Sequence, residues 1–416
     1  MTFFKTIISV WSNFVFLYPL LMSIVWIAGS LLYFLRREYK VTKEIPTDID
    51  WPLISILVPC YNEADTIEET VENLLKLDYP KKEIICVNDG SKDNTGELIK
   101  MLAEKNPEVR GIDCKENKGK ANALRLALFA SKSEYLVCVD SDAILDNDAP
   151  YHLIKHFFNK GERLAAVTGN PRIRNRDTLL GKIQVVEYAS IIGSIKRTQR
   201  ILGKIMTVSG VIVAFRKKAL IDVALWDVDM ITEDIGVSWK FHEKFWDIRY
   251  EPNALCWMLV PEQLTSYWKQ RIRWAQGGQE VILKFWPILK SWKHRRLWPL
   301  YIEQWVSIFW SYSLFILMGY YLLFVVRSIQ DLILILTFSA FSLVLLSVVQ
   351  LIISLLIDSK YDNITSVYFW IAWYPFIYWI VNAAIAVCAF PKAIQSRIKG
   401  GYATWTSPDR GNREVS

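Results

Sequence analysis

Tyr135-Leu-Val-Cys-Val139 is an apolar run rich in β-forming residues, and it passes directly into Asp140-Ser-Asp142. A continuous apolar run of this length is typical of a strand buried on both faces of a sheet. Two carboxylates with one residue between them repel each other and need a cation, and a nucleotide pyrophosphate needs the same cation. Asp-x-Asp also occurs in solvated turns, but the ligands of an α/β sheet bind at the carboxyl ends of its strands. The stretch therefore predicts a buried strand with a metal- and nucleotide-binding pair at its end.

The segments on either side repeat this alternation of strand and helix. Apolar runs bounded by turns indicate further strands, and apolar residues three or four positions apart indicate helices between them. Polar residues again follow the first two strands, as Tyr61-Asn-Glu63 and Asn88-Asp89. The pattern predicts an α/β domain with a mostly parallel sheet covered by helices. The expected strands are 54–58, 84–87, 111–114, 135–139 and 211–215, and the expected helices are 67–75, 95–105 and 121–130.

Long runs without charge indicate a membrane protein, since 52% of the 416 residues are hydrophobic. Residues 7–35 carry no charge, and at about 1.5 Å per residue they exceed a hydrocarbon core of about 30 Å. That length argues against a cleaved signal peptide. The later charge-free runs are Gln304–Val326, Leu332–Ile357 and Asn363–Pro391. The expected organisation is an N-terminal transmembrane anchor (1–36), a water-facing catalytic domain (40–276), three transmembrane helices (304–391) and a basic polar tail (392–416).

Basic residues flank the predicted domain on both sides. Arg36 and Arg37 follow the first span, and Lys293-His-Arg-Arg296 precedes the second, so the positive-inside tendency places the domain in the cytoplasm. One span before the domain and three after it would put the C-terminal tail outside, although that tail is basic. One of the later runs is therefore expected to be re-entrant or interfacial, and the sequence leaves open which. Residues 279–300 interleave tryptophans with bases, which predicts an amphipathic helix at the membrane interface.

Several functional classes are not indicated by the sequence. The net charge of +7 is explained by bases clustered beside the spans, so we expect no nucleic-acid partner. The six cysteines form no C-x-x-C pair and are interpreted as reduced core residues. His152 and His156 lie four residues apart but lack an evident third ligand, so no zinc site is predicted. Neither G-x-x-x-x-G-K-[ST] nor G-x-G-x-x-G occurs.

Two further motifs carry groups suited to sugar transfer. Thr232-Glu-Asp234 offers a carboxylate that could take a proton from an acceptor hydroxyl, although the tripeptide alone is also typical of a helix N-terminus. Gln270-Arg-Ile-Arg-Trp274 supplies two guanidinium groups, whose forks match phosphate oxygens, and an indole face for a sugar ring. Alternatively, these bases belong to an interfacial helix and meet lipid headgroups.

Taken in chain order, the motifs resemble one known set. They are Pro59-Cys-Tyr-Asn-Glu63, Val87-Asn-Asp-Gly-Ser91, Asn117-Lys-Gly-Lys-Ala-Asn-Ala123, Asp140-Ser-Asp142, Thr232-Glu-Asp234 and Gln270-x-x-Arg-Trp274. This set resembles the processive family 2 glycosyltransferases, the synthases of cellulose, chitin, hyaluronan and poly-N-acetylglucosamine. The likeness covers the whole predicted catalytic domain and extends to the flanking spans, and no motif position departs from the family pattern.

The resemblance implies a GT-A fold and an inverting, single-displacement transfer from a UDP-sugar, with Mg²⁺ or Mn²⁺ as cofactor. It implies that Asp234 is the general base. The donor would be bound by Asp89 at the uracil, with Tyr61 and Glu63 nearby, and by Lys120, Asp140 and Arg273. Asp140 and Asp142 would hold the metal. Gln270, Trp274, Glu233 and Gly210 would form the acceptor and gating part, to which the resemblance adds Arg271 and Ser209.

Within the family, the overall organisation looks most like the staphylococcal branch that makes poly-β-1,6-N-acetylglucosamine for biofilm adhesion. That likeness implies UDP-N-acetylglucosamine as donor, a growing polysaccharide as acceptor, and a small accessory membrane subunit. It also implies a multi-pass protein of the bacterial cell membrane. Aromatic residues of the spans could stack on the exported sugar rings or anchor the helices at the lipid interface. These residues are Trp305, Trp310, Tyr312, Trp370, Trp373 and Trp379.

Three alternatives stay open at this point. The chain could be another processive synthase of the hyaluronan, chitin or cellulose type, because linkage depends on how the acceptor hydroxyl is presented. It could be a non-processive enzyme that glycosylates a lipid carrier, although Gln270-x-x-Arg-Trp274 resembles the processive enzymes. It could also be a transporter or scaffold with an inactive transferase domain, against which the complete acidic set argues.

Overall fold

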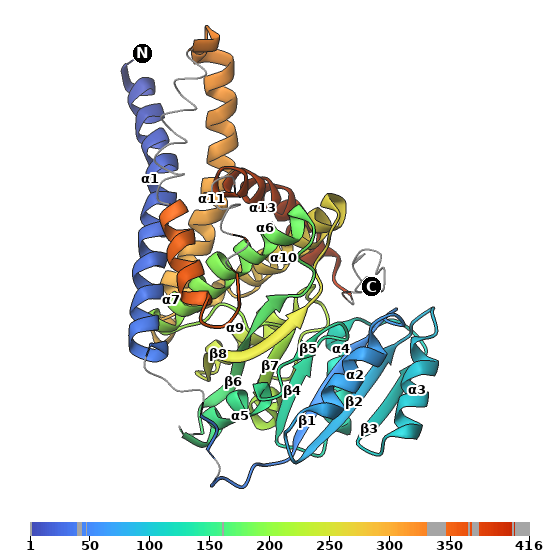
Figure 1. Cartoon of the computed structure of the whole chain (residues 1–416). Coiled ribbons are helices and arrows are strands. Elements are labelled where there is room, and N and C mark those ends of the chain that lie inside the picture. Colours follow the sequence, from blue (N-terminus) through green and yellow to red (C-terminus); the bar gives the residue numbers. More distant parts are fainter. Residues whose placement is uncertain are drawn as a thin grey trace.

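The computed structural model describes residues 2–39, 44–46, 48–159, 162–330, 347–364, 367, 374–401 and 403. An α/β domain forms the lower half of the molecule, and long helices rise from it (Figure 1). The described residues contain an eight-stranded sheet in the order β3-β2-β1-β4-β7-β6-β8-β5. Its strands are β1 (Ile54–Cys60), β2 (Lys82–Asp89), β3 (Val109–Cys114), β4 (Tyr135–Val139), β5 (Ile144–Leu145), β6 (Leu164–Ile173), β7 (Ile212–Arg216) and β8 (Asp247–Met258).

The sheet is parallel in its first half and mixed in its second. Strands β3, β2, β1 and β4 run parallel to one another, as do β6 and β8. Strand β7 is antiparallel to β4 and β6, and β5 is antiparallel to β8. The predicted α/β sheet is therefore confirmed. Strands β6 and β8 were not expected, because polar residues such as Thr168, Asn170 and Arg172 interrupt the apolar run although all three are buried.

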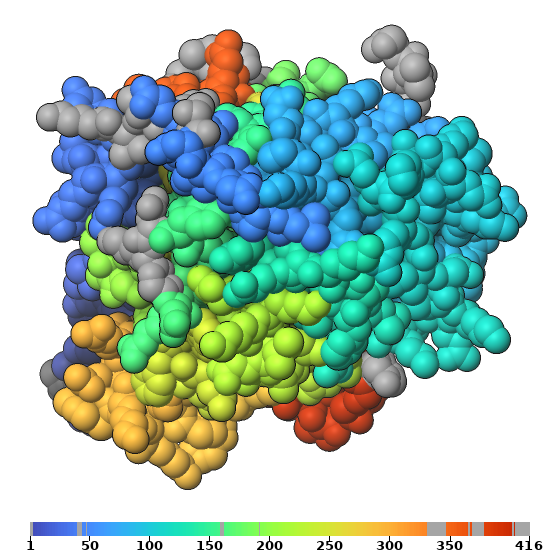
Figure 2. Space-filling model, turned by 90° about the horizontal axis from the view of Figure 1, so that it is seen from below, coloured from blue at the N-terminus to red at the C-terminus, as the bar shows by residue number. Residues whose placement is uncertain are grey.

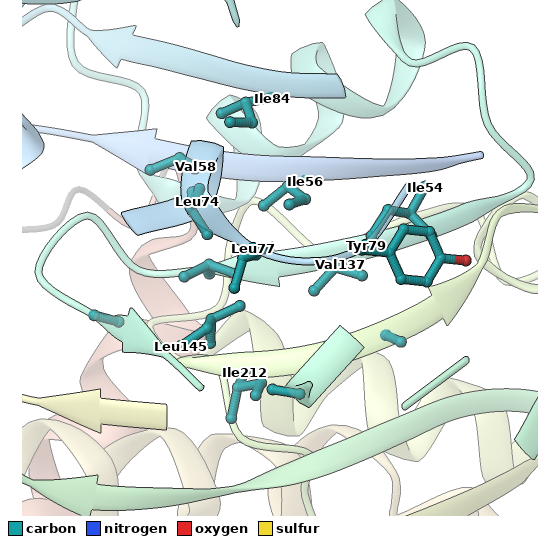
Figure 3. Close-up of a cluster of buried hydrophobic side chains, with 14 of the residues drawn as sticks. Ile54, Ile56, Val58, Leu74, Leu77, Tyr79, Ile84, Val137, Leu145 and Ile212 are labelled. Carbon is teal, nitrogen blue, oxygen red and sulfur yellow. The ribbon is translucent and has the colours of Figure 1, made fainter. Parts of the chain in front are cut away.

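Helices cover both faces of the sheet. Side chains of β1 alternate between two cores: Ile54, Ile56 and Val58 join one, and Leu57 joins the other. Figure 3 shows the first core, where Leu74 lies beside Val58, and Val137 and Ile212 belong to the same cluster. The first core is covered by α2 (Ile67–Lys76), α3 (Thr95–Lys105) and α5 (Ala149–Asn159). The second is covered by α4 (Lys120–Ala130), α8 (Lys217–Asp222) and α9 (Glu233–Glu243).

Among the described residues, three helices are long and apolar enough to cross a membrane. They are α1 (Thr2–Tyr33, continued by a π-helical turn to Glu38), α11 (Trp298–Tyr320, continued to Val325) and α13 (Tyr374–Lys399). Helices α1 and α11 stand side by side (Figure 1), where the Trp310 indole donates to the Val15 carbonyl at 2.8 Å. A shorter apolar helix covers Ser347–Asp358. The rest of the predicted span Leu332–Ile357 lies outside the described residues, as do parts of Asn363–Pro391 and most of the tail 392–416.

Helix α13 does not stand with α1 and α11. It lies across the base of α11 (Figure 1) and packs along α10 (Leu264–Lys284), where the Gln279 amide donates to the Ala386 carbonyl at 2.9 Å. Near its end, Arg397 forms an ion pair with Asp229 of the catalytic domain at 2.8 Å. Seen from below, the red of α13 appears at the rim of that domain (Figure 2).

Two sequence predictions about this region are wrong. Residues 279–300 do not form one amphipathic helix, because α10 ends at Lys284 and two 3₁₀ turns, Trp286–Lys290 and Trp292–His294, precede α11. The cause is Pro287, which cannot donate a backbone hydrogen bond inside a continuing helix. The predicted domain boundary at residue 276 also falls inside α10 rather than between elements.

A helical segment that was not expected joins the membrane helices to the sheet. It consists of α6 (Leu179–Glu187), a π-helical turn and α7 (Ser194–Leu202). Helix α7 packs closely on α1, where the Thr198 hydroxyl donates to the Trp26 carbonyl at 3.1 Å. A Cβ on Gly29 would lie only 2.3 Å from a Thr198 methyl, so this crossing requires glycine.

Buried charges close the junction of these elements. Arg197 of α7 pairs with Glu38 at the end of α1 at 2.7 Å, and with Asp358 at 2.9 Å. Asp358 also pairs with Arg172 of β6 at 2.8 Å. All four side chains are almost completely buried. The sheet, α1, α7 and the helix Ser347–Asp358 are therefore held at one point.

Candidate functional site

The predicted donor residues lie at one edge of the sheet. Strands β2, β1 and β4 are direct neighbours and run parallel, so the loops that follow them lie side by side. Tyr61 and Glu63 follow β1, Asp89 ends β2, and Asp140 follows β4. The structure thus gathers these residues at the carboxyl ends of the strands, as expected.

Asp89 is held by the loop that leads into α4. Its carboxylate accepts hydrogen bonds from the backbone N–H groups of Lys118 at 3.1 Å and Gly119 at 2.8 Å. Burial raises the pKa of Asp89, and these two hydrogen bonds offset only part of that effect. Gly119 adopts φ +89°, which glycine tolerates best, and this turn directs Lys120 at the start of α4.

The loop after β1 is fixed by its neighbours. The Glu63 backbone N–H donates to the Thr95 hydroxyl at 2.8 Å, and the Glu63 carboxylate accepts from Thr66 at 2.8 Å. Asn62 has φ +54° and accepts from the Lys92 backbone N–H at 2.8 Å. Glu63 is buried, whereas Tyr61 is partly exposed beside it. Glu63 therefore supports the loop that presents Tyr61.

Charged groups from three separate segments meet at the end of β4. Lys120 pairs with Asp140 at 2.5 Å and with Glu233 at 3.2 Å. Burial alone would lower the pKa of Lys120, but these two carboxylates outweigh it and raise that pKa. A Cβ added to Gly210 would lie 3.2 Å from the Lys120 Nζ and 3.4 Å from an Asp234 oxygen. Gly210 therefore sits directly over the charged cluster.

Asp234 has the electrostatics of a general base. It lies in the first turn of α9, where the helix dipole favours a carboxylate, and it accepts a hydrogen bond from the Ile235 backbone N–H at 2.9 Å. Burial and the neighbouring charge of Glu233 raise its pKa to about 6, against the opposing effect of Lys120. A carboxylate of that pKa is mostly ionised at neutral pH and is a stronger base than an ordinary aspartate.

The motif Gln270–Trp274 lies on α10 and divides into two functions. Gln270, Arg273 and Trp274 are three and four residues apart, so they share one helix face and line the cavity described below. Arg271 is buried and pairs with Glu187 at 2.7 Å, and its guanidinium lies 4.2 Å from the Trp274 ring centre. Among the described residues Arg273 has no hydrogen-bond or ion-pair partner. Arg271 therefore fixes the helix, and Arg273 is available to a ligand.

One cavity of about 590 Å³ connects this cluster with the membrane helices. Asp140, Asp142 and Asp234 line its catalytic end. Its other end is lined by side chains of α1, α11, the helix Ser347–Asp358 and α13, including Tyr18, Glu303, Ser307, Gln350 and Asn382. The Tyr18 hydroxyl donates to Glu303 at 3.3 Å. Polar groups therefore line part of the cavity even between the apolar helices.

Two of the aromatic residues predicted to meet sugar line this cavity. Trp310 and Trp379 are in edge-to-face contact, with ring centres 5.8 Å apart. Trp305 and Tyr312 instead pack against Phe390, and neither lines the cavity. Trp370 and Trp373 lie outside the described residues.

Asp140 and Asp142 have the chemistry of a divalent-cation site. Their oxygens are hard ligands, and both side chains line the cavity after β4. Within the described part of the chain, no group of three or more His, Cys, Asp or Glu side chains could hold a metal. A cation here would need its other ligands from a nucleotide or from water. His156 is instead bonded to Glu251 at 2.7 Å, and His152 to Asp148 at 3.2 Å.

Sequence reasoning missed Tyr18, Lys196 and Glu303, which α1, α7 and α11 bring to the cavity. Glu303 directly precedes a charge-free run, which could have marked it as a carboxylate at the edge of a span. Tyr18 lies inside such a run, and Lys196 follows no recognised motif, so neither carried a signal.

Known proteins resemble this chain over almost its whole length. Residues 55–224 match the family described as Glycosyl transferase family 2. A poly-β-1,6-N-acetyl-D-glucosamine synthase of Staphylococcus epidermidis is 48% identical over 412 residues, which are 96% of this chain and 98% of the relative. A synthase of the same name from Staphylococcus aureus is 48% identical over 415 residues, 97% and 99% of the two chains.

A solved structure shares the fold. It is a mannosyltransferase from Pyrobaculum calidifontis in complex with GDP-Man and Mn²⁺, with a TM-score of 0.61 and 20% identity. The match covers 90% of this chain and 99% of that one.

Proposed function

The chain belongs to the family 2 glycosyltransferases, and from that premise we propose that it is a processive poly-β-1,6-N-acetylglucosamine synthase. It transfers N-acetylglucosamine from UDP-N-acetylglucosamine to the end of a growing chain. The observation that carries the proposal is the single cavity that joins Asp234 to the membrane helices. A polymer that is extended at the base can occupy that cavity without leaving the enzyme. The sugar follows from the 48% identity to the named synthases over nearly the whole chain.

Asp234 takes the proton from the acceptor hydroxyl as that oxygen attacks the anomeric carbon of the donor. The new glycosidic bond forms as the bond to UDP breaks, so the configuration inverts and one carboxylate suffices. This contrasts with the paired carboxylates of glycoside hydrolysis. Gly210 leaves room for the acceptor beside Asp234, because any side chain there would meet the charged cluster.

Tyr61, Glu63 and Asp89 form the uracil end of the proposed donor site, and Lys120 and Arg273 lie on the side of the pyrophosphate. Asp140 and Asp142 would hold Mg²⁺ or Mn²⁺, which when bound neutralises charge on the departing UDP. Gln270 and Trp274 face the acceptor end of the cavity. Lys120 has a second task, because it balances the charges of Asp140 and Glu233 before any ligand arrives.

The proposed topology gives α13 an interfacial position on the cytoplasmic side. Helix α11 leads away from the domain to Val325, and Asp358 is back at the domain in contact with Arg172 and Arg197, so the chain returns between these points. Helix α13 then stays beside the domain, as the Arg397–Asp229 pair supports. The basic tail is therefore on the same side as Arg36 and Arg37, in agreement with the positive-inside tendency.

Export through the cavity and a small accessory membrane subunit belong to the same proposal. The test uses membranes that contain this protein, with and without that subunit, supplied with Mg²⁺ and one labelled UDP-sugar at a time. We expect long product from UDP-N-acetylglucosamine alone, cut by a β-1,6-hexosaminidase and resistant to chitinase. Label from UDP-glucose only, a requirement for UDP-glucuronate, or a chitinase-sensitive product would overturn the polymer assignment. Products of one or two sugars on a lipid would overturn processivity.

A further inference from the structure

Lys196 is a buried lysine that the proposed mechanism does not use. It lies on α7, only 5% of the residue is exposed, and its side chain lines the cavity on the same side as Ser209, Gly210 and Asp234. Among the described residues its one hydrogen bond is donated by Nζ to the Thr168 hydroxyl at 3.2 Å, and no carboxylate lies within 4.0 Å. The Tyr250 ring centre lies 6.0 Å from its Nζ. A buried ammonium group without an anionic partner is costly, so this position calls for an explanation.

Other buried cations around the cavity differ from Lys196 in this respect. Lys120 has Asp140 and Glu233, Arg271 has Glu187, and the adjacent Arg197 has two carboxylates. The fold gives each of these groups a carboxylate partner. The Nζ of Lys196, in contrast, donates to a neutral hydroxyl and otherwise adjoins the cavity. Its missing partner is therefore expected to be a ligand.

Hydrogen bonds connect Lys196 to the loop beside the base. The Thr168 hydroxyl also accepts from the Ser209 backbone N–H at 2.8 Å. One residue earlier, the Val208 backbone N–H donates to Ser238 at 3.0 Å, and Ser238 donates to the Asp234 carbonyl at 2.7 Å. These hydrogen bonds thus fix the position of a ligand atom bound by Lys196 relative to Asp234 and Gly210.

We propose that Lys196 binds the acetamido carbonyl of the acceptor sugar, and so makes the acceptor site specific for N-acetylglucosamine chains. This inference rests on the proposed function. An amide carbonyl is the strongest neutral hydrogen-bond acceptor on such a chain, and a glucose chain lacks it. The pyrophosphate of the donor is an unsuitable partner, because the proposed function assigns it to Asp140, Asp142 and their cation, whereas the carboxylate that acts on Lys196 is Asp234.

The electrostatics agree with a neutral ligand. Burial lowers the pKa of Lys196 to about 7, with a smaller opposing effect of Asp234. The amine can donate a hydrogen bond to a carbonyl in either protonation state, so it needs no anionic partner to act at neutral pH.

The test compares Lys196→Met, which keeps the length but removes the donor, with Lys204→Met as control. Lys204 lies just beyond α7 and does not line the cavity. Membranes with saturating UDP-N-acetylglucosamine receive either a β-1,6-linked N-acetylglucosamine tetramer or a β-1,6-linked glucose tetramer. The initial rate of extension is measured against acceptor concentration. Because one hydrogen bond to an uncharged partner is at stake, we expect Lys196→Met to raise the KM for the acetylated acceptor about tenfold.

The KM for UDP-N-acetylglucosamine and the use of the glucose acceptor should change less than twofold, and Lys204→Met should behave as the wild type. An equal loss of activity with both acceptors overturns the inference. So does an unchanged preference for the acetylated acceptor over the glucose acceptor. If Lys196→Met no longer binds UDP and is therefore misfolded, Lys196→Gln decides, because its amide still donates. Loss of the preference in a UDP-binding Lys196→Gln variant overturns the inference. Failure of the wild type to extend any acceptor from this donor would instead overturn the proposed function.

Discussion

The proposed donor half of the site, at the strand ends, and its proposed acceptor half, in the cavity, are built in opposite ways. Donor residues such as Asp89 and Asp140 stand at the ends of neighbouring parallel strands and are fixed by adjacent loops. Acceptor residues such as Tyr18, Asp234 and Glu303 come from α1, α9 and α11, far apart in the sequence. The donor half follows from the sheet alone, whereas the acceptor half exists only when the membrane helices are in place. Substitutions should therefore separate donor binding from polymer synthesis.

The largest separation is expected from Asp234→Asn. The amide cannot take the acceptor proton, so the rate of polymer synthesis should fall by a factor on the order of 10² to 10⁴. UDP binding should stay within about twofold, because no donor-side contact is removed. Label incorporation and UDP binding to the solubilised protein measure the two effects. Polymer at the wild-type rate would remove Asp234 from its role.

Measurements of thermal stability should distinguish the buried Arg271–Glu187 ion pair, which supports α10, from ion pairs at the surface. Glu187→Gln leaves Arg271 buried without its anion, which costs about 3–5 kcal/mol. The melting temperature of the solubilised protein should fall by roughly 3–6 °C, because the unfolding entropy of a 416-residue chain is large. The matched control is Glu69→Gln, which breaks the partly exposed pair with Arg174 and should cost about 0–1 kcal/mol. Equal effects of both variants would show that the Arg271–Glu187 pair does not support the helix.

The pH dependence of polymer synthesis should arise from a residue of the acceptor half, Asp234. Asp234 must be ionised to accept a proton, and its raised pKa of about 6 means that activity is complete above that pH. As the pH falls below about 6, kcat/KM should drop roughly tenfold per pH unit. Glu233→Gln removes a neighbouring negative charge and should move this acid limb to lower pH. If the acid limb of the pH profile does not move in that variant, the limb reflects the titration of a group other than Asp234.

A smaller effect is expected at the donor half. Asp89→Asn keeps one acceptor oxygen but turns an NH₂ group toward one of the two backbone N–H donors. The KM for UDP-N-acetylglucosamine should rise about tenfold, with kcat nearly unchanged. A fall in kcat with unchanged KM would mean that the loop before Lys120 acts on the chemical step rather than on binding.

The smallest effect is expected where α13 meets the catalytic domain. Arg397→Ala removes a partly exposed ion pair with Asp229, worth about 0–1 kcal/mol. Polymer synthesis should change less than twofold, and Arg397→Lys should be indistinguishable from the wild type. A loss of tenfold or more would show that this pair holds the acceptor half in its active arrangement.

Sequence alone predicted the donor half closely. The expected elements 95–105 and 135–139 coincide with α3 and β4, because apolar spacing and turn residues mark their ends. The strand-end residues, Asp234 and the motif on α10 were also predicted, through resemblance to the family. What each of these side chains does in catalysis stays a prediction.

The packing of the acceptor half could not be predicted from local sequence patterns. Its contacts depend on tertiary packing, such as the approach of Lys196 to Thr168, for which no local pattern exists. The prediction of one helix over residues 279–300 is wrong because it rested on the aromatic and basic pattern and gave too little weight to Pro287. A proline at that position prevents the helix from continuing. Arg271 was expected to reach a ligand, but Glu187, on an unpredicted helix, occupies it.

The ion-pair junction has a consequence for the order in which the protein is made. The ribosome releases Arg172 and Arg197 long before Asp358, so Arg172 lacks its anion, and Arg197 has only Glu38, until the later helix has been inserted. An unpaired charge in that position is costly, so β6 and α7 cannot settle into their final places earlier. Nascent chains that stop short of Asp358 remain targets for proteolysis. The cell thus obtains a finished transferase domain only together with the membrane helices that line its cavity.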